Sequence, residues 1–192
     1  MDPINIIILL NIIATFGANF SGAQKGLKTS IIKVKEKPKS YLQTLPTSVA
    51  VITLVLLILS LFKIGTFEYS NEILSYRIVG LISYLVFSWV QIWAYKTLGE
   101  NYSQDVVILN NHKLVKSGLY RFIRHPQYLA QFLVDLTASV AVMSYLIFPI
   151  AFVELILLTQ RAKLEETLLK KYFKESFDEY KSKSGFMIPF IG

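Results

Sequence analysis

The sequence predicts an all-α integral membrane protein with about five transmembrane helices, a C-terminal helical hairpin and a cytoplasmic amphipathic helix. Two observations support this prediction. The 192 residues are 53% hydrophobic and only 17% charged, whereas a soluble domain usually carries about 25% charged residues. The charge is also unevenly placed, because 18 of the 20 Lys and Arg residues fall in the blocks 25–39, 96–124 and 161–183. These blocks alternate with apolar runs, as cytoplasmic loops do in membrane proteins.

The composition excludes several classes of function. The chain has no cysteine, which excludes disulfides, thiolate metal sites and a cysteine nucleophile. It has two histidines and no H-x-x-x-H pair, so we expect no metal site. Glycine-rich nucleotide-binding motifs are absent. The net charge of +7 is explained by basic blocks that flank membrane helices, so we expect no nucleic-acid partner.

Three uncharged runs predict the first three spans, at residues 4–24, 45–62 and 78–95. The second and third runs each approach the roughly 20 residues that cross a hydrocarbon core. A basic loop at residues 25–41 is expected between the first two spans.

The 36 residues between Arg124 and Arg161 are too many for one span. They predict a helical hairpin over 125–160 with its turn near Met143-Ser144-Tyr145. The following residues 161–183 have apolar side chains at helical spacing, and they predict either an amphipathic helix on the membrane surface or a continuation of the fifth span into water. Five spans place the N-terminus outside and the C-terminus in the cytoplasm, with all three basic blocks on the cytoplasmic side.

A polar segment at residues 112–128 could bind a ligand at the water boundary. It contains five side chains that can hydrogen-bond or stack, namely His112, Tyr120, Arg124, His125 and Tyr128. Ser117-Gly118 indicates a turn, and Pro126 suits the first turn of a helix, whose free N–H groups could face a polar ligand. Each of these side chains alone is more typical of a residue that anchors the end of a span, but the whole run favours a site.

A second cluster begins at Arg161. Arg161 and Glu165 are four residues apart and share a helix face, so they could form an ordinary surface ion pair or part of a site.

Together the two clusters resemble the isoprenylcysteine carboxyl methyltransferase family, in the form of its short prokaryotic members. This family lies within a wider group of membrane methyltransferases that includes phospholipid methyltransferases. The matching pattern is H-x-L-V-x-x-G-x-Y-x-x-x-R-H-P-x-Y from His112, then R-x-x-x-E-E-x-L from Arg161. The likeness covers roughly residues 95–190. The chain departs from the family at Ala130 and Lys174, where glycine is common, and this bears on local packing.

Chain length and hydropathy predict one membrane domain over residues 1–192, with three spans in 1–95. The resemblance implies that residues 96–192 are the catalytic half. It implies S-adenosylmethionine as the cofactor. Arg161 would hold the carboxylate of the methyl acceptor, and Glu165 would pair with the ammonium group of the cofactor. The implied cofactor-binding residues are His112, Lys113, Leu114, Val115, Tyr120, His125, Pro126, Gln127, Tyr128 and Glu165.

This assignment is chemically consistent. A carboxylate acceptor is already ionised at pH 7, so attack on the sulfonium methyl group needs no general base. The reaction needs alignment of the reacting atoms, and the planar guanidinium of Arg161 can bind a carboxylate through two hydrogen bonds. The acceptor is expected to be lipid-linked and to enter from the bilayer, while the cofactor arrives from the cytoplasm.

Two acids, Asp135 and Glu154, lie inside the predicted hairpin at similar depth on facing helices. Intramembrane acids usually face a cavity or a partner. Glu154 shares a helix stripe with Arg161 and Glu165, so it could reach the acceptor tunnel or support Arg161. It could equally be a protonated or hydrogen-bonded packing residue.

Two other functions stay open. The first is N-methylation of an amine headgroup, whose protonated nucleophile would favour a nearby base and would make Arg161 a poor partner. The second is a non-enzymatic membrane protein that retains the fold. The sequence predicts neither the natural acceptor nor the oligomeric state.

Overall fold

The computed structural model describes residues 2–192, and for residues 19–33 it describes the backbone alone. The chain is mostly helical. Its elements in order are α1 (Pro3–Lys33), β1 (Val34–Glu36), the 3-10 helix η1 (Tyr41–Gln43), α2 (Leu45–Leu61), α3 (Leu74–Leu98), η2 (Gly99–Asn101), β2 (Ile108–Leu109), η3 (Gly118–Arg121), α4 (Pro126–Ala141), α5 (Ile147–Phe173) and α6 (Glu175–Lys183).

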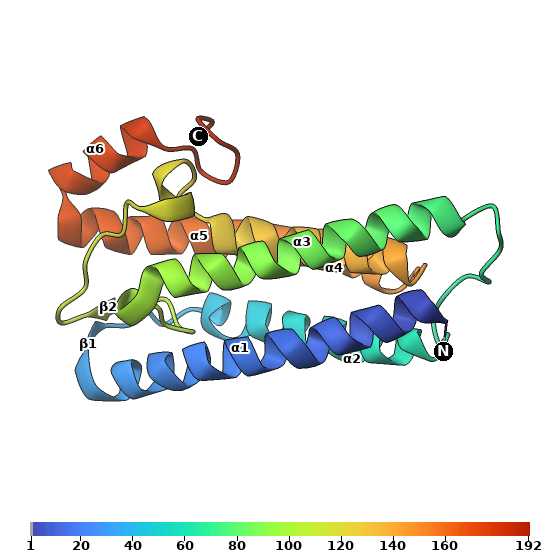
Figure 1. The fold of residues 1–192 in the computed structure, drawn as a ribbon. Helices are drawn as coiled ribbons and strands as arrows, with labels where there is room; N and C mark the ends of the chain where they lie inside the picture. Colours follow the sequence, from blue (N-terminus) through green and yellow to red (C-terminus); the bar gives the residue numbers. More distant parts are fainter. Residues whose placement is uncertain (1) are drawn as a thin grey trace.

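The long helices lie side by side in one bundle (Figure 1). The N-terminus lies at one end of this bundle, and β1, β2 and α6 gather at the other end. The polar connections predicted to be cytoplasmic are therefore collected at the end that carries α6.

Two helical stretches are long and apolar enough to cross a membrane by length and composition, Tyr41–Leu61 and Leu74–Asn101. A shorter apolar stretch is Pro3–Ala18, within α1. Large apolar side chains such as Val55, Ile82 and Trp89 point outward from α2 and α3, while polar side chains such as Asn11 and Ser88 are buried and bonded to each other at 3.0 Å. This arrangement supports a membrane protein. The other three predicted spans remain predictions.

The predicted hairpin turn is present. Helix α4 ends at Ala141 and α5 begins at Ile147, and Met143 between them has a φ of 53°. The Ser144 hydroxyl lies 3.1 Å from that of Ser60 and donates to the Gly65 carbonyl at 3.1 Å, which fixes the turn against the end of α2.

Helices α3 and α4 pack closely, and Gly80 permits the approach. A Cβ atom at this position would lie 2.7 Å from the backbone nitrogen of Ala141. This distance is too short for a non-bonded contact, so any side chain larger than that of glycine would push the two helices apart. The contact holds α4 in place along α3, and α4 carries part of the polar site.

Helix α1 corrects the predicted end of the first span. It continues past residue 24 to Lys33, so the basic loop predicted over 25–41 is shorter. Lysine is a good helix former, one glycine does not end a helix, and no proline occurs between Pro3 and Pro38. The chain then forms β1, which pairs antiparallel with β2.

The C-terminal residues correct the prediction of one amphipathic helix over 161–183. Helix α5 continues the hairpin helix to Phe173, which is the second of the two predicted alternatives, and α6 is separate. The break is Lys174, with φ 46° and ψ −121°, a conformation that favours glycine. Gly99 ends α3 with nearly the same angles, φ 54° and ψ −120°.

Candidate functional site

The polar segment 112–128 is held by the C-terminal residues. The backbone N–H groups of Arg124 and His125 donate to the carbonyls of Gly185 at 2.8 Å and Phe186 at 3.1 Å. In return, the Gly185 N–H donates to Phe122 at 2.9 Å. Residues from two distant parts of the sequence therefore form one unit at the start of α4.

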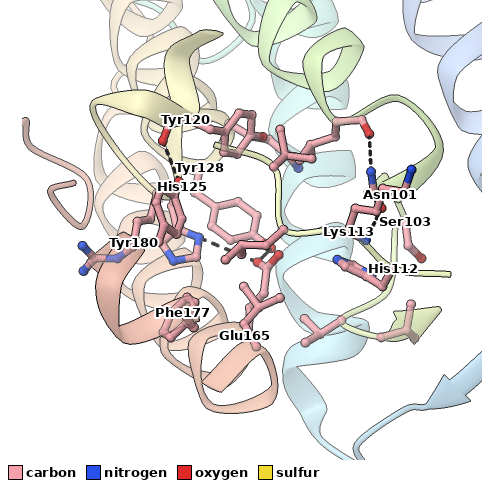
Figure 2. A pocket seen from close by; sticks show the side chains of 18 of the residues that line it. Asn101, Ser103, His112, Lys113, Tyr120, His125, Tyr128, Glu165, Phe177 and Tyr180 are labelled. Atoms are coloured by element: carbon pink, nitrogen blue, oxygen red, sulfur yellow. Dashed lines mark hydrogen bonds and ion pairs between the residues drawn. The ribbon is translucent and has the colours of Figure 1, made fainter. Parts of the chain in front are cut away.

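This unit borders a first pocket, formed between the loop after β2, α4, α5 and α6 (Figure 2). Its wall combines aromatic rings, apolar side chains and a few polar groups. The lining residues are Leu98, Asn101, Ser103, Asp105, Val106, Val107, His112, Lys113, Leu114, Val115, Tyr120, Arg124, His125, Gln127, Tyr128, Glu165, Leu169, Phe177 and Tyr180.

His112 contributes a polar atom without a partner to this pocket. Its Nδ1 is buried and makes no hydrogen bond within the described part of the chain. Burial lowers the pKa of the ring from its ordinary value, which favours the neutral form. Buried polar groups normally have partners, and the unmatched Nδ1 therefore indicates a polar ligand.

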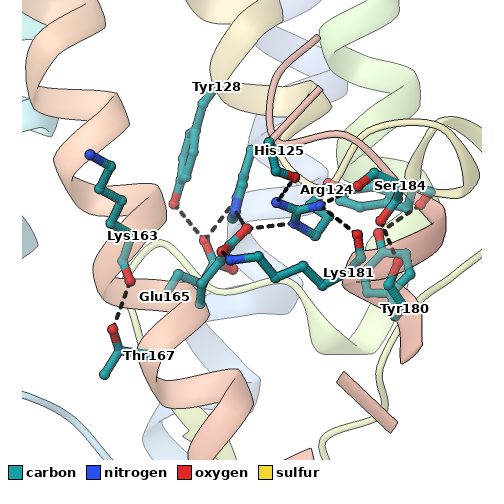
Figure 3. A network of polar contacts seen from close by, with 12 residues as sticks. Arg124, His125, Tyr128, Lys163, Glu165, Thr167, Tyr180, Lys181 and Ser184 are labelled. Atoms are coloured by element: carbon teal, nitrogen blue, oxygen red, sulfur yellow. Dashed lines mark hydrogen bonds and ion pairs between the residues drawn. The ribbon is translucent and has the colours of Figure 1, made fainter. Parts of the chain in front are cut away.

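A charged network supports the floor of the first pocket (Figure 3). Arg124 Nε donates to Glu166 Oε1 at 2.6 Å, and His125 Nε2 lies 3.3 Å from the same oxygen. Lys181 Nζ lies 3.2 Å from Glu166 Oε2. Burial raises the pKa of Glu166, but hydrogen bonds from His125 and Arg124 outweigh burial and lower it to about 2. The network fixes the orientation of His125.

Tyr128 joins Arg161 to Glu165. Its hydroxyl accepts from Arg161 Nε at 3.1 Å and donates to Glu165 Oε2 at 3.1 Å. The possible surface ion pair between Arg161 and Glu165 does not form, because both side chains turn toward this hydroxyl instead. Glu165 also lies 3.7 Å from His125 Nδ1.

Arg161 is bound by backbone carbonyls. Its Nη1 donates to Leu42 at 3.1 Å and to Gln43 at 3.4 Å, and its Nη2 donates to Gln104. These bonds and the bond to Tyr128 use four of the five N–H groups of a guanidinium. All four acceptors are uncharged, so none of them neutralises the positive charge of the guanidinium.

The comparison with two other buried arginines makes this clear. Arg77 is paired with Asp2 at 3.0 Å and Arg124 with Glu166 at 2.6 Å. Arg161 is equally buried, at 6% exposure, yet it has no carboxylate partner among the side chains that the structure describes. A buried charge is costly unless it is paired, so Arg161 indicates a site for an anion.

Arg161 lines a second pocket, which lies deeper in the bundle. The lining residues are Pro46, Thr47, Ala50, Tyr95, Tyr102, Gln104, Gln127, Tyr128, Gln131, Glu154, Leu158 and Arg161. Tyr128 and Gln127 line both pockets. The two pockets therefore meet at these side chains.

The structure distributes the predicted site residues between the two pockets. Every residue predicted to bind cofactor lines the first pocket except Pro126, which is buried at the first turn of α4. Arg161 and Glu154 line the second pocket. Sequence reasoning missed Asn101, Ser103 and the aromatic pair Phe177 and Tyr180. Only the apolar spacing of the last two along α6 could have pointed to them.

Comparisons with known proteins point to one family. Residues 78–171 match the model of the isoprenylcysteine carboxyl methyltransferase (ICMT) family. The protein-S-isoprenylcysteine O-methyltransferase of Saccharomyces cerevisiae is 30% identical over 128 residues, which are 65% of this chain and 54% of the yeast protein. The enzyme of the same name from Schizosaccharomyces pombe is 31% identical over 98 residues, which are 48% of this chain and 41% of that protein.

A solved structure has the same fold. It is the eukaryotic intramembrane Ras methyltransferase ICMT, with a TM-score of 0.58 and 23% identity, over 76% of this chain and 52% of that chain. The chain thus spans about half the length of these relatives. The family resemblance predicted from the two motifs is confirmed.

Proposed function

We propose that this relative of the isoprenylcysteine carboxyl methyltransferases is a membrane enzyme that transfers a methyl group from S-adenosylmethionine to the carboxylate of a lipid-linked acceptor. The named relatives support carboxyl methylation of isoprenylcysteine. One observation of this chain carries the proposal, namely that Arg161 is buried in a pocket that adjoins the first and has no carboxylate partner among the described side chains.

The first pocket suits the proposed cofactor. Aromatic and apolar side chains such as Tyr120 and Leu169 suit an adenine ring, the unmatched Nδ1 of His112 suits a polar atom, and the Glu165 carboxylate suits an ammonium group. When bound, S-adenosylmethionine supplies an electrophilic methyl group on a sulfonium. Glu165 would hold the amino-acid end of the cofactor, and the Tyr128 ring would border its cationic centre, where an aromatic face is favourable.

The second pocket suits the acceptor. The Arg161 guanidinium would bind the acceptor carboxylate through its charge and the one N–H group that protein acceptors leave free. It would hold the carboxylate beside Tyr128 and Gln127, where the pockets meet. A carboxylate needs no base at pH 7, so the contribution of these residues is alignment and exclusion of water. The carbonyl contacts of Arg161 fix the guanidinium before the acceptor arrives.

The alternative acceptor, an amine headgroup, is disfavoured by the same arginine. An ammonium group would be repelled by a buried guanidinium that has no compensating carboxylate. A role without catalysis would leave the buried charge of Arg161 and the orphaned His112 Nδ1 unexplained.

We also propose five spans with the N-terminus outside and the first pocket facing the cytoplasm. The positive blocks support this orientation. The second pocket would then open toward the bilayer, from which the lipid portion of the acceptor enters.

Methyl transfer from labelled S-adenosylmethionine to farnesylated cysteine, fatty acid and phospholipid acceptors tests the proposal in purified protein reconstituted in lipid nanodiscs. We expect labelled ester with the carboxylate acceptors, and Arg161→Ala should abolish it while cofactor affinity, measured by calorimetry, stays within about twofold. Labelled phospholipid amine without ester would instead support N-methylation. No cofactor binding at millimolar concentration would reject both enzymatic functions.

A further inference from the structure

Glu154 is a buried carboxyl group that the proposed transfer reaction does not use. It is 0% exposed, it lines the second pocket, and neither of its oxygens has a hydrogen-bond partner in the described part of the chain. Buried polar atoms almost always have partners, and an unmatched one costs about 1–3 kcal/mol. The second pocket therefore contains an unfilled polar position in addition to Arg161.

Asp135 of α4 can satisfy only part of this need. It is the titratable neighbour that interacts with Glu154, and it accepts a hydrogen bond from Gln131 at 2.8 Å. A proton shared between the two carboxyl groups would engage one oxygen of Glu154. The other oxygen of this pocket-lining residue remains an acceptor without a donor among the described residues.

The distance between Glu154 and Arg161 defines where a ligand that binds both residues would carry its hydrogen-bond donor. Both residues belong to α5 and are seven positions apart, so they lie on one face of the helix, separated by about 10 Å along its axis. Leu158, between them, also lines the pocket. A ligand whose carboxylate lies at Arg161 and whose chain follows α5 would pass Glu154 about two helical turns deeper.

Resting on the proposed function, we propose that Glu154 is a specificity subsite for an acceptor that carries a hydrogen-bond donor, a hydroxyl or an amine, on its chain about 10 Å from the carboxylate. A plain hydrocarbon chain would leave the free oxygen of Glu154 unmatched. A donor at this position would match it.

Binding to the protein without cofactor tests the subsite separately from catalysis. The probes are stearate, 2-hydroxystearate and 10-hydroxystearate, because the hydroxyl of the last lies roughly two helical turns from its carboxylate. Affinities are measured by ligand-dependent thermal stabilisation in nanodiscs. We expect the protein to bind 10-hydroxystearate about tenfold more tightly than the other two.

Glu154→Leu should remove this preference and leave stearate binding intact. Val153→Leu is the matched control on the same helix, because Val153 is 52% exposed on the outer face, and it should retain the preference. Should Glu154→Leu fail to fold, Glu154→Gln keeps the shape of the side chain and should reduce the preference by at least about threefold.

Equal affinity for the three fatty acids, or a preference that survives Glu154→Leu and Glu154→Gln, would overturn the subsite. Either result would leave the proposed methyl transfer standing, because that is measured with labelled cofactor. Conversely, a Glu154-dependent preference in a protein that transfers no methyl group would support the subsite and reject the proposed function.

Discussion

The Tyr128 hydroxyl lies 3.1 Å from Arg161 Nε, and Tyr128 lines both pockets. The same hydroxyl donates to Glu165. The group proposed to bind the acceptor and the group proposed to bind the cofactor are therefore oriented by one phenol.

We predict that Tyr128→Phe lowers kcat while the protein still folds. The substitution keeps the ring but leaves Arg161 Nε and Glu165 Oε2 without this partner, so both lose orientation. We expect kcat to fall about 10- to 100-fold, with a smaller change in cofactor affinity. Steady-state kinetics and calorimetry on the same preparation measure the two effects. A kcat unchanged within twofold would show that the hydroxyl does not align the reactants.

Glu165→Gln is predicted to weaken the affinity for S-adenosylmethionine by about tenfold or more, because the carboxylate would lose its charge-assisted bond to the ammonium group. Calorimetry measures this change. Methylthioadenosine is the control ligand, since it lacks the amino-acid portion and should bind the wild type and the variant equally. If both ligands weaken to the same extent, Glu165 acts on the shape of the pocket rather than on the ammonium group.

Glu166 is predicted to make stability depend on pH in the acid range. Its pKa is about 2 in the folded protein, against 4.5 for the unperturbed group. Because the folded pKa is the lower one, this stabilisation is complete above pH 4.5 and is lost as the pH falls toward 2. The shift corresponds to stabilisation on the order of 3 kcal/mol.

The measurement is the unfolding temperature in detergent from pH 7 down to pH 3, for the wild type and for Glu166→Gln. The wild type should lose more stability than the variant over this range. Glu179→Gln is the control, because the Glu179–Lys183 pair is exposed and such pairs contribute little. Parallel curves for the wild type and Glu166→Gln would contradict the prediction.

Lys174→Gly is predicted to stabilise the protein. The φ of 46° at Lys174 is unfavourable for a residue with a Cβ atom, by about 1–3 kcal/mol. Glycine removes this strain, but it also increases the conformational entropy of the unfolded chain, which offsets part of the gain in stability. A net gain of about 1 kcal/mol is expected in chemical unfolding.

Gly99 provides the matched reverse test. It has nearly the same backbone angles, and a Cβ atom there would meet nothing within 4 Å. Gly99→Lys should therefore lose stability through the backbone alone, by about 1 kcal/mol. Equal stability of the wild type and both variants would mean that neither helix end is strained.

The helical hairpin and the polar segment 112–128 could be predicted because their signals are local. An uncharged run of fixed length predicts spans, and the polar segment is contiguous in the sequence. The end of α1 could not be predicted from the onset of charge at Lys25, because lysine is a good helix former and does not end a helix.

Other features depend on contacts between distant residues. The carbonyls that hold Arg161 come from Leu42, Gln43 and Gln104, and no local pattern identifies them. Phe177 and Tyr180 reach the first pocket only because Lys174 turns α6 back toward it. The family pattern has glycine at the position of Lys174. The positive φ of Lys174 explains why glycine is favoured there.

Helix α5 carries Glu154, Arg161 and Glu165 without interruption. The helix therefore fixes the distances between the groups proposed to bind the two ligands. Each residue inserted or deleted between Glu154 and Arg161 would turn one of them by about 100° relative to the other. Point substitutions can therefore change which groups the protein recognises, but only a change in the length of α5 can alter the separation at which it recognises them.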